Sequence, residues 1–237
     1  GAALSANLAD TDLEQWTNPL GDAQYRDYVS RTGRVHDLGT IGYVGRSAIW
    51  TLRTAVELNA FADYYKFYLN ESAAKAGSFL TFGNSGDSPN DTYCEPGPFR
   101  PWCEASGLDG YWATPACRTH ADSCLLVLHY STFYDGGYFE QLFRNNRIRA
   151  VFGYYGDNFF SRVRSVAAQS RFPLFYWWQP DPFLLELDAV RVSFPDYFTG
   201  CDVKLGHPDV IFDAENGTVK CDYGAKTLWK AVSNRVR

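Results

Sequence analysis

Short apolar segments alternate with helix-like segments through residues 125–194, and this alternation constrains the fold more than any other feature of the chain. The segments with the length and apolar content of buried strands are 125–130, 148–155, 174–178 and 190–194. The segments with helical spacing between them are 137–146 and 159–170. Strands that alternate with helices in short units predict an α/β fold with largely parallel pairing.

Other segments have patterns of their own. Residues 55–74 carry apolar and aromatic side chains at helical spacing and predict a largely buried helix. Residues 39–45 read Gly-x-x-Gly-x-x-Gly and predict a glycine-punctuated loop. Residues 223–237 predict a helix whose inward positions are Leu228, Trp229 and Val232.

The cysteines indicate an oxidising compartment. The chain has six of them, without a Cys-x-x-Cys pair, and its four histidines have no zinc-site spacing. Four cysteines fall in residues 83–124, a stretch too long for an ordinary connection, so we expect a stapled, loop-rich insertion there. Because closing a short loop costs less entropy, the predicted disulfides are Cys94–Cys103, Cys117–Cys124 and Cys201–Cys221.

Potential glycosylation sites favour the same compartment. The Asn-x-Ser/Thr pattern occurs at Asn70, Asn90 and Asn216. Methionine is absent and the chain begins at Gly1, so we interpret it as a processed or excerpted piece of a longer product. We therefore predict a glycosylated domain of the secretory pathway, located outside the cell or at its surface.

Composition excludes several function classes. The net charge is −5 and no block of Lys or Arg occurs, which argues against nucleic-acid binding. No apolar run approaches the roughly 20 residues of a membrane-spanning helix. The phosphate-binding glycine loops and the Gly-x-Ser-x-Gly elbow are missing, and an isolated Asp10-Thr-Asp12 is too common a pattern to indicate a metal site. We therefore predict no enzymatic activity, no cofactor and no metal.

The most informative segment is Phe175-Tyr-Trp-Trp-Gln-Pro-Asp-Pro-Phe183. A strand that ends in Trp177-Trp178 presents aromatic faces at the carboxyl edge of a sheet, where open α/β sheets bind ligands. Alternation along a strand predicts that the two indoles point to opposite sides, so that only one faces a ligand. Two prolines would stiffen the turn around Asp181.

This segment resembles the Trp-x-Pro element of glycine betaine and choline substrate-binding proteins of ABC transporters, whose Trp is one wall of an aromatic cage. Residues 16–28, from Trp16 to Tyr28, are similar to the family's first aromatic element, and residues 39–45 with Trp50 fall at its Gly-rich segment. Further stretches resemble eukaryotic versions of the domain that occur as ectodomains of surface receptors; they are Tyr134-Asp135-x-Gly137, Glu140-Gln141, residues 190–195 and Cys221-Asp-Tyr223.

The resemblance implies a bilobed, type II periplasmic-binding-protein-like fold. Lobe I would comprise residues 1–55 and 190–237, with its first strand missing before Gly1, and lobe II residues 56–189. Walls of the cage would come from Trp16, Trp178 and one of Trp50, Trp112 or Tyr43. Backbone N–H groups around Gly42 could hold a ligand carboxylate.

The implied ligand is a quaternary ammonium compound or an amine. Stacked aromatic faces attract such a cation at roughly 0.5–2 kcal/mol per well-placed ring. The family has a His where this chain has Asp181, and an acid suits a cation such as choline better than a zwitterion. The partner would be this small ligand, together with a membrane receptor or an extracellular assembly attached through flanking segments.

Two other functions compete with ligand capture. The same fold could be a structural glycoprotein unit of an extracellular filament or coat, with a degenerate cleft. A secreted carbohydrate-active enzyme or lectin would also expose aromatic rings, and an enzyme would need two carboxylates across a cleft. The candidates are Glu14, Asp135, Asp181 and Glu186, with no pattern that joins them.

Overall fold

The computed structural model describes residues 13–16, 35–88, 90–94, 96, 100–201 and 214–233. The strands are β1 (Leu13–Trp16), β2 (Val35–Leu52), β3 (Tyr111–Ala113), β4 (Leu125–His129), β5 (Ala150–Tyr154), β6 (Leu174–Gln179), β7 (Ala189–Arg191) and β8 (Lys226–Ser233). The α-helices are α3 (Arg53–Leu58), α4 (Glu71–Ala76), α5 (Arg100–Glu104), α6 (Thr132–Asp135), α7 (Tyr138–Asn145), α8 (Phe159–Ala168) and α9 (Pro182–Glu186). Short 3₁₀ helices occupy Tyr65–Leu69, Phe82–Asn84, Pro115–Cys117, Ala121–Ser123 and Gly156–Asn158.

The chain divides into a larger unit, Ser47–Tyr223, and a smaller unit formed by Gly1–Arg46 and Gly224–Arg237. Strand β2 begins in the smaller unit and ends in the larger one. The lobe boundaries predicted from the sequence, at residues 55/56 and 189/190, stay a prediction.

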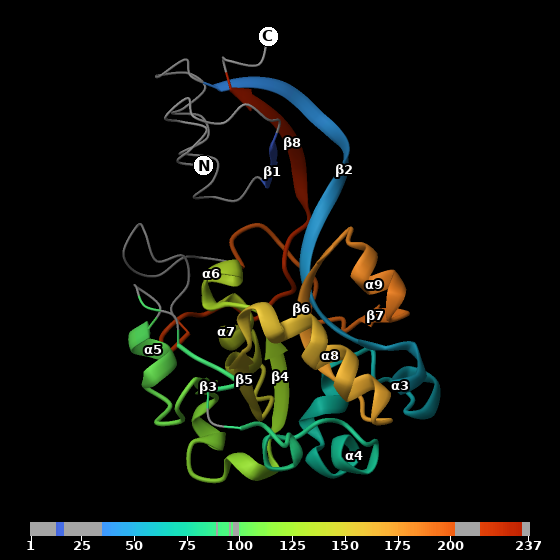
Figure 1. Cartoon of the computed structure of the whole chain (residues 1–237), viewed down its shortest axis with the longest axis vertical. Helices are drawn as coiled ribbons and strands as arrows, with labels where there is room; N and C mark the ends of the chain where they lie inside the picture. The colour runs from blue at the N-terminus through green and yellow to red at the C-terminus, as the bar shows by residue number, and fades with distance from the viewer. Residues whose placement is uncertain are drawn as a thin grey trace. The chain divides into compact units, whose positions relative to one another are not determined.

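The larger unit contains the predicted α/β core. Its strands follow the order β2–β6–β4–β5–β3, and β7 pairs with the end of β2 (Figure 1). Strand β4 pairs in parallel with both β5 and β6, whereas β3 and β7 pair antiparallel with their neighbours. The fold is thus a mixed α/β sheet whose central strands are parallel, as the alternation of strands and helices predicts.

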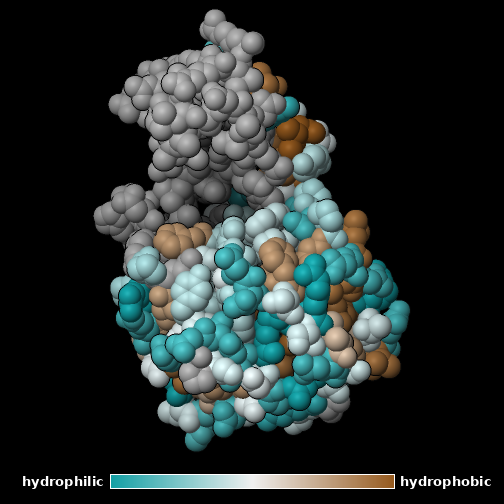
Figure 2. Space-filling model, in the orientation of Figure 1, coloured by the Kyte–Doolittle hydropathy of each residue, from teal (hydrophilic) through white to brown (hydrophobic). Residues whose placement is uncertain are grey.

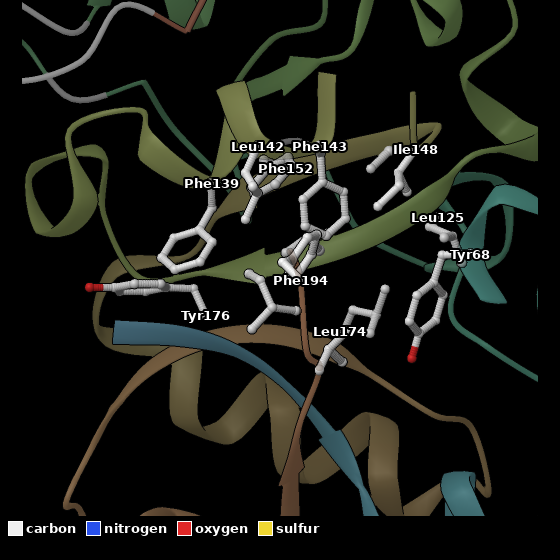
Figure 3. Packing of buried hydrophobic residues seen from close by; sticks show 14 of the residues in the cluster. Tyr68, Leu125, Phe139, Leu142, Phe143, Ile148, Phe152, Leu174, Tyr176 and Phe194 are labelled. Carbon is white, nitrogen blue, oxygen red and sulfur yellow. The ribbon is translucent and has the colours of Figure 1, made fainter. Parts of the chain in front are cut away.

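One face of this sheet packs against α7. Alternate residues of the parallel strands point to this side; they are Leu125, Val127, Ala150, Phe152, Tyr154, Leu174 and Tyr176. Figure 3 shows Phe139, Leu142 and Phe143 of α7 directed toward this layer, with Phe194 next to Phe143 and Ile148 to one side. Burial of these side chains stabilises the layer by roughly 25 cal/mol for each Å² of apolar surface removed from water.

The opposite face packs against α8 and α9. The intervening residues of the strands point here; they are Leu126, Leu128, Val151, Phe175 and Trp177. Phe159, Val163 and Val166 of α8 cover them together with Phe183 and Leu184 of α9. Because both faces are covered, the strands read as continuous apolar runs rather than as alternating ones.

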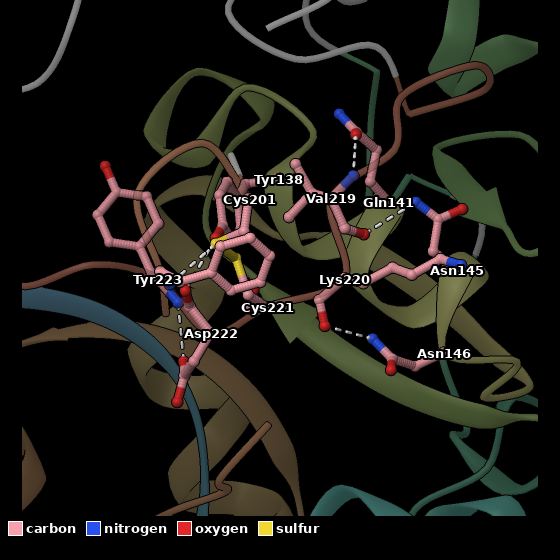
Figure 4. The surroundings of a disulfide bond; sticks show 11 residues. Tyr138, Gln141, Asn145, Asn146, Cys201, Val219, Lys220, Cys221, Asp222 and Tyr223 are labelled. Carbon is pink, nitrogen blue, oxygen red and sulfur yellow. Dashed lines mark hydrogen bonds between the residues drawn. A yellow bond between two sulfur atoms is a disulfide. The ribbon is translucent and has the colours of Figure 1, made fainter. Parts of the chain in front are cut away.

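Disulfides hold the loop-rich parts of the larger unit. The pairs Cys94–Cys103, Cys117–Cys124 and Cys201–Cys221 are present, which are those predicted from short loop closure. Two of them lie in the insertion 83–124. The third borders the segment 217–222, whose backbone carbonyls accept hydrogen bonds from Tyr138 and from the amides of Asn145 and Asn146 (Figure 4).

The smaller unit is built from antiparallel pairs of β8 with β1 and with the first part of β2. The loop predicted at 39–45 is wrong, because these residues continue β2. The pairing register shifts around Thr40, and Gly39 and Gly42 each have a φ of 88°. The glycines therefore mark β-bulges in a strand rather than a loop.

Two predicted helices are also wrong. Residues 226–233 form strand β8, since apolar positions four residues apart, such as Leu228 and Val232, share a face in a strand as well as in a helix. The single helix over 55–74 is replaced by α3, a 3₁₀ turn and α4. Phe61 has a φ of 70° and Asn59 binds the carbonyl of Ala55, so the first helix ends there.

The surface of the larger unit is mixed. On the side where α3 and α8 lie, hydrophobic and hydrophilic residues are interspersed (Figures 1 and 2). Asn70, Asn90 and Asn216 are all exposed, as a glycan acceptor must be. Within the described residues, no helix has the length and apolarity to cross a membrane.

Candidate ligand-binding site

The carboxyl ends of β4 and β6 bring four aromatic rings together in the larger unit. We call Tyr130, Tyr134, Trp177 and Trp178 the aromatic face. Tyr134 lies 5.1 Å from Trp178 between ring centroids, and Tyr130 lies 5.0 Å from Tyr134. Tyr134 is 45% exposed and Trp178 is partly exposed, so solvent reaches part of this face.

The two indoles do not point to opposite sides, contrary to the prediction from strand alternation. Their rings stack at 3.9 Å with an interplanar angle of 21°. Trp177 is buried and also stacks on Phe159, whereas Trp178 lies over it with more exposure. Both residues lie near the carboxyl end of β6, where Trp178 packs against Trp177 and Tyr134 instead of the opposite face of the sheet. Stacking then buries one face of each indole.

Asp181, which the sequence analysis predicted to contact the ligand, caps a helix. It is the N-cap of α9, and its Oδ1 accepts the backbone N–H of Phe183 at 2.8 Å. A side chain of this type satisfies an N–H group that the helix itself leaves unpaired. A contact between Asp181 and a ligand stays a prediction.

The remaining tryptophans of the larger unit pack in its interior. Trp50 is buried, and its indole N–H donates to the carbonyl of Trp177 at 2.9 Å, so it supports the aromatic face from below. Trp112 is fully buried against the other face of the sheet, and its N–H donates to Glu215 at 2.8 Å. That position gives Trp112 a core role instead of the predicted cage role.

Three predicted site residues belong to the smaller unit. Trp16 lies in β1, opposite Leu228 in the register, and its side chain is outside the described residues. Gly42 lies at a bulge of β2, and Tyr43 beside it is exposed. Their approach to Trp178, which the sequence resemblance implies, stays a prediction.

A polar cluster of His129, Asp135 and Glu140 lies on the α7 side of the sheet, where the His129 ring contacts Phe152, Tyr154 and Tyr176. All three side chains are fully buried. His129 Nε2 lies 3.4 Å from an Asp135 oxygen, and the His129 ring stacks on Tyr176 at 4.2 Å. Tyr154 donates its hydroxyl proton to Glu140 at 2.6 Å. Buried polar groups of this kind are costly unless each has a partner.

Backbone groups complete the environment of Asp135. Its two oxygens accept the N–H groups of Gly137 at 3.2 Å and Phe139 at 2.9 Å. His129 precedes Tyr130 in the chain and Asp135 follows Tyr134, so the cluster holds both ends of the segment that carries these tyrosines. The cluster therefore positions half of the aromatic face.

The cluster is better suited to sharing protons than to holding a metal ion. Its donor atoms lie within 4.8 Å of one another, close enough for one ion. A His that binds a metal through one nitrogen donates a hydrogen bond with the other. Here His129 Nδ1 accepts the N–H of Ser131 at 3.2 Å, which leaves the ring proton on Nε2, directed toward Asp135.

The two carboxyl groups have opposite pKa shifts. Burial, followed by the nearby Asp135 carboxylate, raises the pKa of Glu140 well above its ordinary value. Burial also acts to raise the pKa of Asp135, but His129 and the Phe139 N–H outweigh it and hold that pKa below its ordinary value. Asp135 therefore loses its proton at a lower pH than Glu140 does.

The sequence analysis did not identify His129 and Glu140 as members of a site. A lone His at the end of an apolar strand resembles any core residue, and Glu140 stands in a helix whose neighbours are apolar. Asp135 and Glu140 are five residues apart, a spacing that does not put two side chains on one helical face, so no local pattern joined them.

Comparisons with known proteins give fold-level similarity only. No protein-family model and no curated protein sequence matches the chain. Alignments over 98% of the chain exist with an ABC-transporter choline-binding protein in complex with choline (12% identity, TM-score 0.40, 57% of that chain) and with lactococcal OpuAC complexed with glycine betaine (9%, 0.36, 61%). A third is the glycine betaine/L-proline-binding protein ProX of Borrelia burgdorferi (11%, 0.36, 59%).

The chain spans about three fifths of the length of these proteins.

Proposed function

We propose that the chain is an extracellular small-molecule-binding module that captures an organic cation, a quaternary ammonium compound or an amine, on the aromatic face. The observation that carries this proposal is the pairing of exposed Tyr134 with Trp178 at the carboxyl edge of the sheet. Aromatic faces attract cations through their quadrupole, with the largest effect for Trp. The edge itself is the usual ligand position in open α/β sheets.

The buried charge supports a cation rather than an anion. Asp135 directly follows Tyr134 in the chain, and its carboxylate is buried in the low-dielectric interior. His129 and two backbone N–H groups face this carboxylate and offset part of its charge, but a buried anion acts over a longer range than it would in water. A cation resting on Tyr134 and Trp178 would gain from it, and a carboxylate would lose.

The disulfides and the exposed Asn-x-Ser/Thr sites support an extracellular location. Disulfides persist in oxidising compartments. Attachment to a membrane receptor remains part of the proposal, motivated by the sequence resemblance.

The experiment compares choline with its uncharged carbon isostere, in which a tert-butyl group replaces trimethylammonium. Calorimetry of the intact, oxidised chain should show binding of choline and at least about tenfold weaker binding of the isostere. Trp178→Ala should abolish choline binding, whereas Phe133→Ala, which removes a neighbouring exposed ring outside the aromatic face, should not. Equal binding of choline and isostere, or full binding by Trp178→Ala, would refute the proposal.

One observation favours the alternative, a structural glycoprotein unit of an extracellular filament or coat. Trp50 and Trp112 are both buried, so two of the three candidates for the third cage ring have core positions. A chain that binds none of choline, betaine, carnitine or simple amines, yet forms assemblies visible by electron microscopy, would fit this second function.

A further inference from the structure

Two adjoining hollows lie at the other end of the sheet in the larger unit. One has a volume of about 390 Å³ and the other about 460 Å³, and both are lined by Ser78 and Ser170. Phe172 donates its N–H to the carbonyl of Ser78, and Thr81 bridges to Leu125, the first residue of β4. The hollows therefore stand at the amino ends of β4 and β6, whereas the aromatic face stands at their carboxyl ends. Six residues of β6 separate the two sites, which corresponds to about 20 Å.

The first hollow is cationic. Its lining includes Lys75 and Arg171 with the hydroxyls of Ser78, Thr81 and Ser170, and none of its described lining residues is acidic. Arg171 donates one N–H to the carbonyl of Asn84, which fixes the guanidinium at the wall. A guanidinium has further N–H donors in a fixed fork that matches a carboxylate or phosphate.

The second hollow has a mixed lining. Its apolar side chains are Leu52, Leu58, Ala167 and Phe172, and they lie beside Thr54, Asn59, Ser78 and Ser170. Leu58 is 75% exposed, so a ligand in this hollow could cover it. Because Ser78 and Ser170 line both hollows, the two hollows adjoin, and we call them together the groove.

We propose that this groove binds a small organic anion with an apolar body, its acid group at Lys75 and Arg171 and its hydrocarbon part along Leu58 and Phe172. The chain as a whole carries a net charge of −5, so two cations with no acidic neighbour in the lining are a local exception that an anion would complement. An apolar wall strengthens binding with each methylene group that it covers. The site is separate from the aromatic face and does not depend on the proposed capture of a cation.

The test uses decanoate as the probe, with decanol and acetate as partial probes. Decanol has the apolar body without the charge, and acetate has the charge without the body. Calorimetry or ligand-observed NMR at concentrations below micelle formation should show decanoate binding at least about tenfold more tightly than either. Equal binding of decanoate and decanol would remove the cationic half of the proposal and overturn it.

Variants locate the binding. The double variant Lys75→Ala/Arg171→Ala should weaken decanoate at least about tenfold and leave decanol unchanged. Arg147→Ala/Lys220→Ala is the matched control, because it removes the same charge from exposed residues outside the groove. Leu58→Asp should abolish decanoate binding without disturbing the core, because Leu58 is exposed.

Unchanged decanoate binding in either the double variant or Leu58→Asp would show that decanoate does not bind in this groove as proposed, and the proposal would be wrong. Trp178→Ala should leave decanoate binding intact. Loss of choline binding and loss of decanoate binding are therefore independent results.

Discussion

The two ends of strands β4 and β6 hold charge in opposite ways. At the carboxyl ends, Asp135 and Glu140 are fully buried beneath aromatic rings and depend on other protein groups for every hydrogen bond. At the amino ends, Lys75 is exposed and Arg171 is partly exposed, so water can solvate both. A buried charge is coupled to folding, whereas a solvated charge is available to a ligand at little cost to stability. Substitutions at the two ends should therefore differ in what they change.

The largest effect is expected for Asp135→Ala. This change removes the acceptor for the N–H groups of Gly137 and Phe139 and leaves His129 without its carboxylate. Loss of one partner in a buried charged network typically costs about 3–5 kcal/mol of unfolding free energy. Urea unfolding with the disulfides intact would measure it. Asp157→Ala is the control, because that carboxylate accepts the Tyr130 hydroxyl at an exposed position and should cost less than about 1 kcal/mol. Similar costs for the two variants would contradict the contrast between the ends.

The next effect concerns pH and Glu140. In the folded chain the pKa of Glu140 is raised above its ordinary 4.5, so the folded state keeps a proton that the unfolded state loses as pH increases. The unfolding free energy should then fall with rising pH between the two pKa values, by up to about 1.4 kcal/mol per pH unit. Asp135 has the opposite sign, because its lowered pKa makes its contribution disappear as pH falls below 3.8.

Glu140→Gln should therefore flatten the loss of stability above about pH 5. Denaturant unfolding at a series of pH values would measure the slope. Glu186→Gln is a matched control, because Glu186 is exposed and its pKa is lowered by the hydrogen bond from Arg164. The explanation fails if Glu140→Gln keeps the wild-type slope on the alkaline side.

The sequence predicted the α/β core because its segments are long and apolar enough to distinguish strands from helices. Strands β4, β5 and β6 with helices α7 and α8 lie where the pattern placed them. The errors at 39–45 and 223–237 share one cause: a short pattern of apolar residues or glycines fits more than one kind of secondary structure. Leu228 and Val232 share a face in either element, and the glycines of 39–45 mark bulges as readily as a loop.

The candidate site was predictable in part. Aromatic residues before two prolines indicate a strand end with exposed rings, which leads to Trp178. The stacking of Trp177 on Trp178 and the burial of Trp112 depend on tertiary packing that no local pattern encodes. His129, Asp135 and Glu140 come from β4, α6 and α7, and their cluster forms only when these three elements pack together. A single polar residue among apolar neighbours does not predict such a cluster.

A smaller effect on choline affinity is expected at Tyr134, where two variants distinguish the contribution of the ring from that of the hydroxyl. Tyr134→Ala removes one aromatic wall beside Trp178 and should weaken choline binding about threefold to fivefold, which corresponds to a single exposed cation–π contact. Tyr134→Phe keeps the ring and should bind choline about as well as the wild type. Calorimetric titration of the two variants gives the comparison. If the Phe variant loses as much affinity as the Ala variant, the hydroxyl and not the ring face contacts the ligand.

The smallest effect on stability is expected at the amino ends of the strands. Lys75→Ala and Arg171→Ala should each change the unfolding free energy by no more than about 0.5 kcal/mol, because water replaces the lost contacts of an exposed charge. The same urea titration that reports a large loss for Asp135→Ala would measure this change. A loss of several kcal/mol in either variant would mean that these cations stabilise the fold as the buried cluster does, and the contrast between the two ends would disappear. A small loss combined with weaker decanoate binding would instead show that one end of the sheet uses its charges for folding and the other for a ligand.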